Sequence, residues 1–115
     1  MMEKNKDFEP LKGLIAATFT PFDEDGKLYL DPIPRIVEHL AKCSINALFI
    51  NGTTGEGPSL TEEERIIIAD SYTKETKIHG IKSIIHVGHE SLQTAGSLAT
   101  HAAEIGADCI SAVPT

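Results

Sequence analysis

Short apolar segments of strand length alternate with longer segments of helical period, and this alternation constrains the fold more than any other feature of the chain. The expected strands are GLIAATFTP (13–21), NALFI (46–50), SIIHV (83–87) and CISAV (109–113). They recur roughly every thirty residues, which is the spacing that parallel βαβ units need. The chain is therefore predicted to be α/β, either an open doubly wound sheet or part of an eightfold barrel. In both architectures the ligand side is the carboxyl end of the strands.

The segments between these strands carry helix start signals. The expected N-caps are Asp31, with Pro32 in the first helical position, Thr61, which forms a capping box with Glu64, and Ser91. Gly106 is expected to end the last helix, in which Leu92 and Ala102 belong to one apolar stripe. These signals predict three helices, each following one of the first three strands.

Length and composition narrow the class of protein. The chain has 115 residues, whereas a closed eightfold barrel usually takes roughly 250. A net charge of −7, with four Phe, two Tyr and no Trp, argues against nucleic acid or an anionic membrane as a partner. No segment approaches a membrane span in length, and residues 1–10 are expected to form a flexible tail rather than a signal peptide. We therefore expect a cytoplasmic protein in which Cys43 and Cys109 are buried, reduced thiols.

The glycine-rich segment NGTTGEGP (51–58) leaves the carboxyl end of the second expected strand. Its three glycines allow a tight turn with exposed backbone N–H groups, and the hydroxyls of Thr53 and Thr54 lie beside them, so the segment is a candidate site for a small carboxylate or phosphate. The alternative is an ordinary βα turn without a ligand. A nucleotide phosphate loop is disfavoured, because the lysine of that motif is missing and Glu56 would repel phosphate.

Two histidines near the end of the third expected strand invite a metal interpretation. His86 and His89 are three residues apart, and Glu90 follows. That spacing does not bring ligands together on a path from strand to loop, and the sequence offers no obvious third ligand, so no metal site is expected. We expect His86 to be a partly buried strand residue and His89 to be a loop residue on the ligand face, where it can contact a polar part of a substrate.

Several segments together resemble one known family. NGTTGEGPSLTEEER (51–65), preceded by GLIAATFTPFDEDGKL (13–28) and followed by IIHVG (84–88) and HAAEIGAD (101–108), resembles the N-acetylneuraminate lyase and dihydrodipicolinate synthase family of pyruvate-dependent class I aldolases. The amino-acid sequence at 84–88 is more similar to that of the sialic acid lyase branch. The resemblance implies a homotetrameric (β/α)8 TIM barrel in which a lysine Schiff base does the chemistry with no metal or added cofactor. It also implies that Thr53 and Thr54 bind the carboxylate of a keto acid.

The chain departs from that family in one respect. The family's Schiff-base lysine and proton-transferring tyrosine lie on later strands, beyond Thr115, so no catalytic residue is expected in this chain. Lys12 and Lys82 precede strands and so belong to the opposite face, which serves stability in barrels. Residues 11–115 are therefore expected to be the amino-terminal half of a TIM barrel, with four strands and three helices, whose remainder is missing.

The resemblance leaves three functions open. The first is a lyase that splits N-acetylneuraminate into pyruvate and N-acetylmannosamine, the 115-residue chain alone being inactive. The second is dihydrodipicolinate synthase or another keto-acid aldolase of the family. The third is a non-catalytic half-barrel that binds a carboxylate and covers its parallel edge with another chain.

Overall fold

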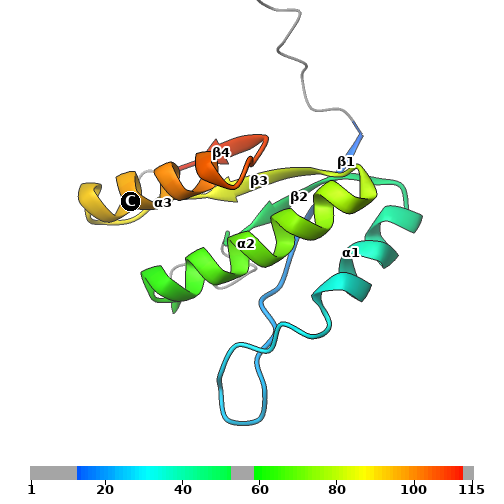
Figure 1. Cartoon of the computed structure of the whole chain (residues 1–115), viewed down its shortest axis with the longest axis horizontal. Helices are drawn as coiled ribbons and strands as arrows, with labels where there is room; N and C mark the ends of the chain where they lie inside the picture. The colour runs from blue at the N-terminus through cyan, green and yellow to red at the C-terminus, as the bar shows by residue number, and fades with distance from the viewer. Residues whose placement is uncertain (1–12, 53–58, 113–115) are drawn as a thin grey trace, which may run out of the picture.

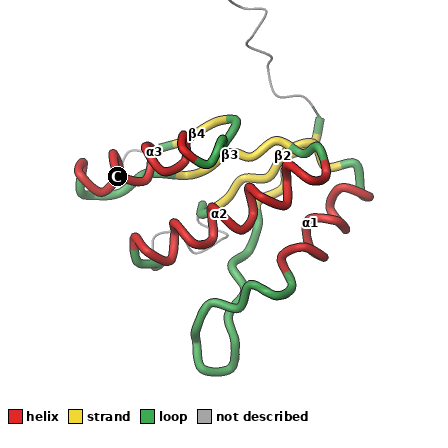
Figure 2. The backbone as a smooth tube through the Cα atoms, viewed as in Figure 1, coloured by secondary structure: helices red, strands yellow, loops and turns green. Residues whose placement is uncertain are grey.

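Strands and helices alternate along the part of the chain that the computed structural model describes, residues 13–52 and 59–112 (Figures 1 and 2). The elements are β1 (Leu14–Ala17), α1 (Ile33–Lys42), β2 (Ile45–Ile50), α2 (Glu62–His79), β3 (Lys82–His86), α3 (Leu92–Glu104) and β4 (Cys109–Ser111). Their number and order confirm the prediction of four strands and three helices. The expected tail at 1–10 lies outside the described residues.

The four strands form one parallel sheet in the order β1-β2-β3-β4. The three helices lie on one face of that sheet (Figure 1). This follows from the right-handedness of βαβ crossovers, because successive crossovers that all step in the same direction put their helices on the same side. A doubly wound sheet would reverse its strand order at a switch point. The observed order is that of a barrel.

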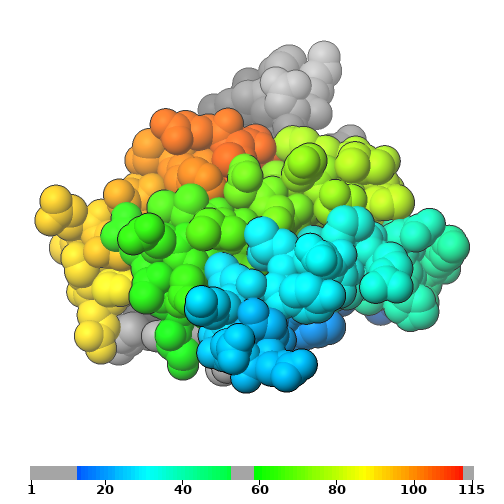
Figure 3. Space-filling model, turned by 60° about the horizontal axis from the view of Figure 1, so that its bottom comes forward, coloured from blue at the N-terminus to red at the C-terminus, as the bar shows by residue number. Residues whose placement is uncertain are grey.

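The core lies between the sheet and the helices. It contains Leu48 and Ile50 of β2, Ile85 of β3, Val37 of α1, Ile68, Ala69 and Tyr72 of α2, and Leu98 and Ala102 of α3. Side chains alternate along a strand, so Ile84 and His86, the neighbours of Ile85, face the other side of the sheet. Figure 3 shows the outer surface of this layer, with α2 between α1 and α3.

Helix α2 begins at the predicted capping box. The Thr61 hydroxyl accepts a hydrogen bond from the Glu64 N–H at 3.0 Å, and the Glu64 carboxylate accepts one from the Thr61 N–H at 2.9 Å. Two N–H groups that a helix start leaves without partners are thereby satisfied. The helix ends at Gly80, whose φ of 69° is the left-handed conformation that glycine adopts without strain. Ser91 caps α3 as predicted, accepting from the Thr94 N–H at 3.2 Å.

The predicted cap of α1 is wrong. Pro32, not Asp31, occupies the N-cap position, and no side chain caps this helix. The physical reason is that Pro32 and Pro34 have no N–H to satisfy, and the Ile33 N–H already donates to the Leu30 carbonyl at 3.0 Å.

Two expectations of burial are also wrong. Leu92 is 88 % exposed, because it is the first residue of α3 and precedes the part of that helix that packs on the sheet. Cys43 is exposed at the end of α1, where its Sγ lies 3.6 Å from His39 Nε2, and Cys109 is half-buried. Both are free thiols, as expected.

Candidate functional site

The predicted anion site falls on a loop whose two ends are described and whose centre is not. Asn51 and Gly52 follow β2 directly at the carboxyl end of the sheet, as the sequence predicts, and the chain resumes at Ser59. Thr53 and Thr54 lie outside the described residues. Their proposed contact with a carboxylate therefore stays a prediction, and the geometry below concerns the groups that flank them.

The first two residues of this loop are buried, one with an unusual backbone conformation and the other in close contact with an aromatic ring. Asn51 has a φ of 66°, in the left-handed region that Asn tolerates better than most residues. Its side-chain Nδ2 donates to the Arg65 carbonyl at 2.9 Å. A Cβ on Gly52 would overlap the ring of Phe49. A larger residue here would force the Phe49 ring to shift, so the close approach of the backbone to this ring favours glycine.

Arg65 is the most unusual residue at this end of the sheet. It lies in the first turn of α2, is 2 % exposed, and donates from Nη1 to the Gly88 carbonyl at 2.8 Å and from Nη2 to the His86 carbonyl at 2.7 Å. Burial lowers the pKa of its guanidinium. No role for Arg65 was predicted from the sequence. The signal that it was buried is periodicity, since it shares a helix face with Ile68, Ala69 and Tyr72.

His86 ends β3 on the face of the sheet away from the helices. Its ring centroid lies 6.0 Å from that of Phe49, at an interplanar angle of 46°. Burial lowers the pKa of His86, the charge of Arg65 lowers it further, and the nearby Ser111 backbone opposes both. Its buried Nδ1 has no hydrogen-bond partner within the described part of the chain. A neutral imidazole with an open polar atom thus faces the inner side of the sheet beside the loop.

This histidine makes stability depend on pH. Because the pKa of His86 is lower in the folded state than the usual value near 6.5, the unfolded chain binds the proton more tightly. Stability should therefore be complete above about pH 6.5 and fall as the pH drops toward the folded pKa, by at most about 1.4 kcal/mol per pH unit. Urea unfolding between pH 5 and 8 checks this. The variant His86→Gln should flatten the dependence, and identical curves for the two proteins would contradict the assignment.

The other sequence-predicted groups do not join this cluster. His89 is exposed, and its Nδ1 accepts from the Ser91 N–H at 2.9 Å, next to the start of α3. Within residues 13–52 and 59–112, no three His, Cys, Asp or Glu side chains come together as a metal site would require. Tyr72 is buried and donates to the Phe19 carbonyl at 2.8 Å. Burial raises its pKa to about 12, against a smaller opposing effect of Thr18, so Tyr72 is unsuited to carry protons near neutral pH.

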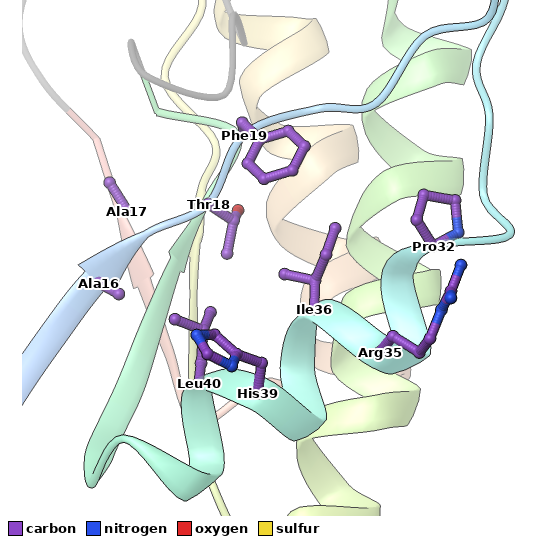
Figure 4. A pocket seen from close by; sticks show the side chains of 9 residues that line it. All are labelled: Ala16, Ala17, Thr18, Phe19, Pro32, Arg35, Ile36, His39 and Leu40. Atoms are coloured by element: carbon purple, nitrogen blue, oxygen red, sulfur yellow. The ribbon is translucent and has the colours of Figure 1, made fainter.

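One pocket lies between β1 and α1 and extends to the carboxyl end of β1 (Figure 4). Its volume is about 470 Å³, and it is lined by Ala16, Ala17, Thr18, Phe19, Pro32, Arg35, Ile36, His39 and Leu40. The lining is mostly apolar and borders the free edge of β1. The closing unit of a barrel packs against the first strand at this edge, so we interpret the pocket as a packing surface rather than a substrate site.

None of the helices in the described ranges is both long enough and apolar enough to cross a membrane.

Comparisons with known proteins agree with the fold. The profile of the Dihydrodipicolinate synthetase family matches residues 10–115. N-acetylneuraminate lyase of Xenopus tropicalis is 46 % identical over 104 residues, which are 90 % of this chain and 34 % of the relative. The chain thus spans about a third of the length of the curated relatives that it matches.

Two solved structures give the same result in three dimensions. N-acetylneuraminate lyase of Proteus mirabilis has a TM-score of 0.86 and 34 % identity, over 90 % of this chain and 35 % of that one. Dihydrodipicolinate synthase of Aquifex aeolicus has a TM-score of 0.81 and 33 % identity, over 87 % of this chain and 33 % of that one. The four strands and three helices are thus the amino-terminal part of a TIM barrel, and the chain belongs to the Dihydrodipicolinate synthetase family.

Proposed function

We propose that these residues begin an N-acetylneuraminate lyase, which splits N-acetylneuraminate into pyruvate and N-acetylmannosamine. The observation that carries the proposal is the 46 % identity to a lyase of that name, over 90 % of this chain. The solved lyase structure is also slightly closer in TM-score than the solved synthase. The segment His86-Val87-Gly88, in which β3 ends at His86, resembles the lyase branch and supports the same choice.

The proposed chemistry is that of a class I aldolase. A lysine on a later strand of the complete barrel forms a Schiff base with the keto carbon of the substrate, and the imine accepts the electron pair when the carbon–carbon bond beyond it breaks. The role of the present residues is to bind and orient. We assign the substrate carboxylate to the hydroxyls of Thr53 and Thr54, which would hold the adjacent keto carbon in line for the lysine.

Three further properties belong to this proposal. The complete enzyme is a cytoplasmic homotetramer that needs no metal or added cofactor. The 115-residue chain by itself does not cleave N-acetylneuraminate, because the Schiff-base lysine is expected on a strand that it lacks. Two of the described lysines do not offer a substitute: Lys82 begins β3 at the amino end of the sheet, away from the loop, and Lys77 donates to the Gly106 carbonyl at 2.9 Å.

Borohydride trapping tests the proposal. The complete protein is incubated with pyruvate or N-acetylneuraminate, reduced with borohydride and examined by intact mass and peptide mapping. We expect a stable adduct on one lysine outside residues 1–115, together with release of N-acetylmannosamine from N-acetylneuraminate. An adduct with pyruvate but no cleavage of N-acetylneuraminate would favour a synthase or another aldolase of the family. No adduct with either compound would favour a binding module.

A further inference from the structure

We propose that Arg65 is a positioning residue that fixes the ends of β2 and β3 relative to each other, where they border the proposed carboxylate site. The inference rests on the proposed function, because it concerns the loop to which carboxylate binding is assigned. Arg65 does not itself contact the substrate in this proposal. It acts through the backbone of His86 and Gly88 on one side and through Asn51 on the other.

Three hydrogen bonds carry the argument. The guanidinium donates to the carbonyls of His86 and Gly88, which are the last residue of β3 and the second residue beyond it. The main-chain carbonyl of Arg65 accepts from Asn51 Nδ2 at the end of β2. One residue in the first turn of α2 therefore bridges two neighbouring strand ends, and each bond is no longer than 2.9 Å. The planar guanidinium suits this task, since its donors have a fixed fork geometry.

Fold stability alone does not explain a charge at this position. Arg65 is almost completely buried, and the described residues place no carboxylate within ion-pair distance of its guanidinium. Its Nε and the Asn51 Oδ1 are both buried without a hydrogen-bond partner in the same part of the structure. Well-packed apolar side chains in place of buried charges are often neutral or stabilising. A buried arginine whose guanidinium donates to two backbone carbonyls is better explained by what it positions.

Both ends that Arg65 holds border the proposed site. Asn51, in its left-handed conformation, and Gly52, pressed against Phe49, lead directly into Thr53 and Thr54. On the other side the His86 ring lies against the Phe49 ring. A displacement of either end would move the groups to which carboxylate binding is assigned and so weaken binding of the substrate.

Steady-state kinetics of the complete enzyme provide the first test. Arg65→Lys keeps the charge but cannot donate to two carbonyls with the same planar fork. We expect it to raise KM for N-acetylneuraminate by about tenfold or more while changing kcat less. The reason is that the substrate carboxylate is bound in both the ground state and the transition state, and its binding would be weakened. Asn51→Gly tolerates the positive φ, removes the Nδ2 donor, and should shift KM in the same direction.

Thr76→Ala is the matched control. Thr76 is buried on the same helix at its other end, where its hydroxyl donates to the Thr73 carbonyl at 2.8 Å. Its loss should lower stability and leave KM unchanged. If Arg65→Lys and Asn51→Gly also leave KM unchanged, the positioning role is refuted and the bonds are structural only.

Amide hydrogen exchange separates this proposal from the proposed function. In Arg65→Lys, exchange should accelerate locally at residues 86–88 and 51–52, including Val87, whose N–H donates to the Ser111 carbonyl. Thr76→Ala should leave those amides unchanged. If the wild-type protein proves not to cleave N-acetylneuraminate, the proposed function fails. Hydrogen exchange alone then decides whether Arg65 fixes the ends of β2 and β3. Local acceleration at both strand ends would support it, and uniform or absent acceleration would overturn it.

Discussion

Replacing both Thr53 and Thr54 with valine in the complete enzyme is expected to lower kcat/KM for N-acetylneuraminate about 10²- to 10⁴-fold. Valine keeps the branched shape and removes the hydroxyl. A hydrogen bond to a charged group contributes about 1.5–3 kcal/mol, and each 1.4 kcal/mol is a factor of ten. Because the carboxylate is present in both ground and transition states, most of the loss should appear in KM. Initial rates over a range of substrate concentrations measure it.

The matched control for this change is Ser59→Ala. Ser59 is an exposed hydroxyl residue at the far end of the same loop, so the variant should keep wild-type kcat and KM. The single variants Thr53→Val and Thr54→Val should each lose part of the activity. Wild-type kinetics in the double variant would show that the carboxylate is bound elsewhere. That outcome would not change the result expected from borohydride trapping of pyruvate.

Ile68→Ala is expected to destabilise the folded state by about 2–5 kcal/mol, because it removes three buried carbons and leaves a cavity between α2 and the sheet. Ile68 is fully buried in the core cluster. Its neighbour Ile67 is 43 % exposed, so Ile67→Ala makes the same chemical change at a position facing outward. That variant should cost about 1 kcal/mol or less.

Urea unfolding followed by circular dichroism measures both variants under the same conditions. The relevant quantity is the difference between the urea midpoints of the two variants, because each replaces a β-branched isoleucine of α2 by alanine and removes the same side-chain atoms. Equal midpoints would mean that α2 does not pack on the sheet through Ile68 as described.

Much of the fold could be predicted because its signals are local. The strand-length apolar segments and the thirty-residue spacing predict parallel βα units, and the capping box of Thr61 and Glu64 predicts the start of α2 within one turn. The prediction failed at the start of α1, where the sequence satisfies the helix start in a different local way. Asp31 is a good capping residue, but two prolines removed the N–H groups that it would have capped.

The geometry of the candidate site was less accessible to sequence reasoning, because it depends on contacts between distant segments. Arg65 and Gly88 are 23 residues apart, and Arg65 and Asn51 are 14 apart. Three glutamates followed by an arginine are also typical of an exposed helix start, so this composition does not indicate that the arginine is buried. The choice of Thr53 and Thr54 came from loop chemistry and family resemblance. It remains a prediction.

The strand order of the sheet bears on how the chain folds. Each strand pairs with the one made just before it, and a single helix separates the two in sequence. Synthesis releases residues from the amino terminus, at roughly 5–20 per second, whereas short loops close within microseconds. Within the described sheet, every strand that leaves the ribosome therefore finds its partner already present. The sheet can grow at one edge as the chain is made, and no pairing among β1, β2, β3 and β4 has to wait for residues not yet synthesised.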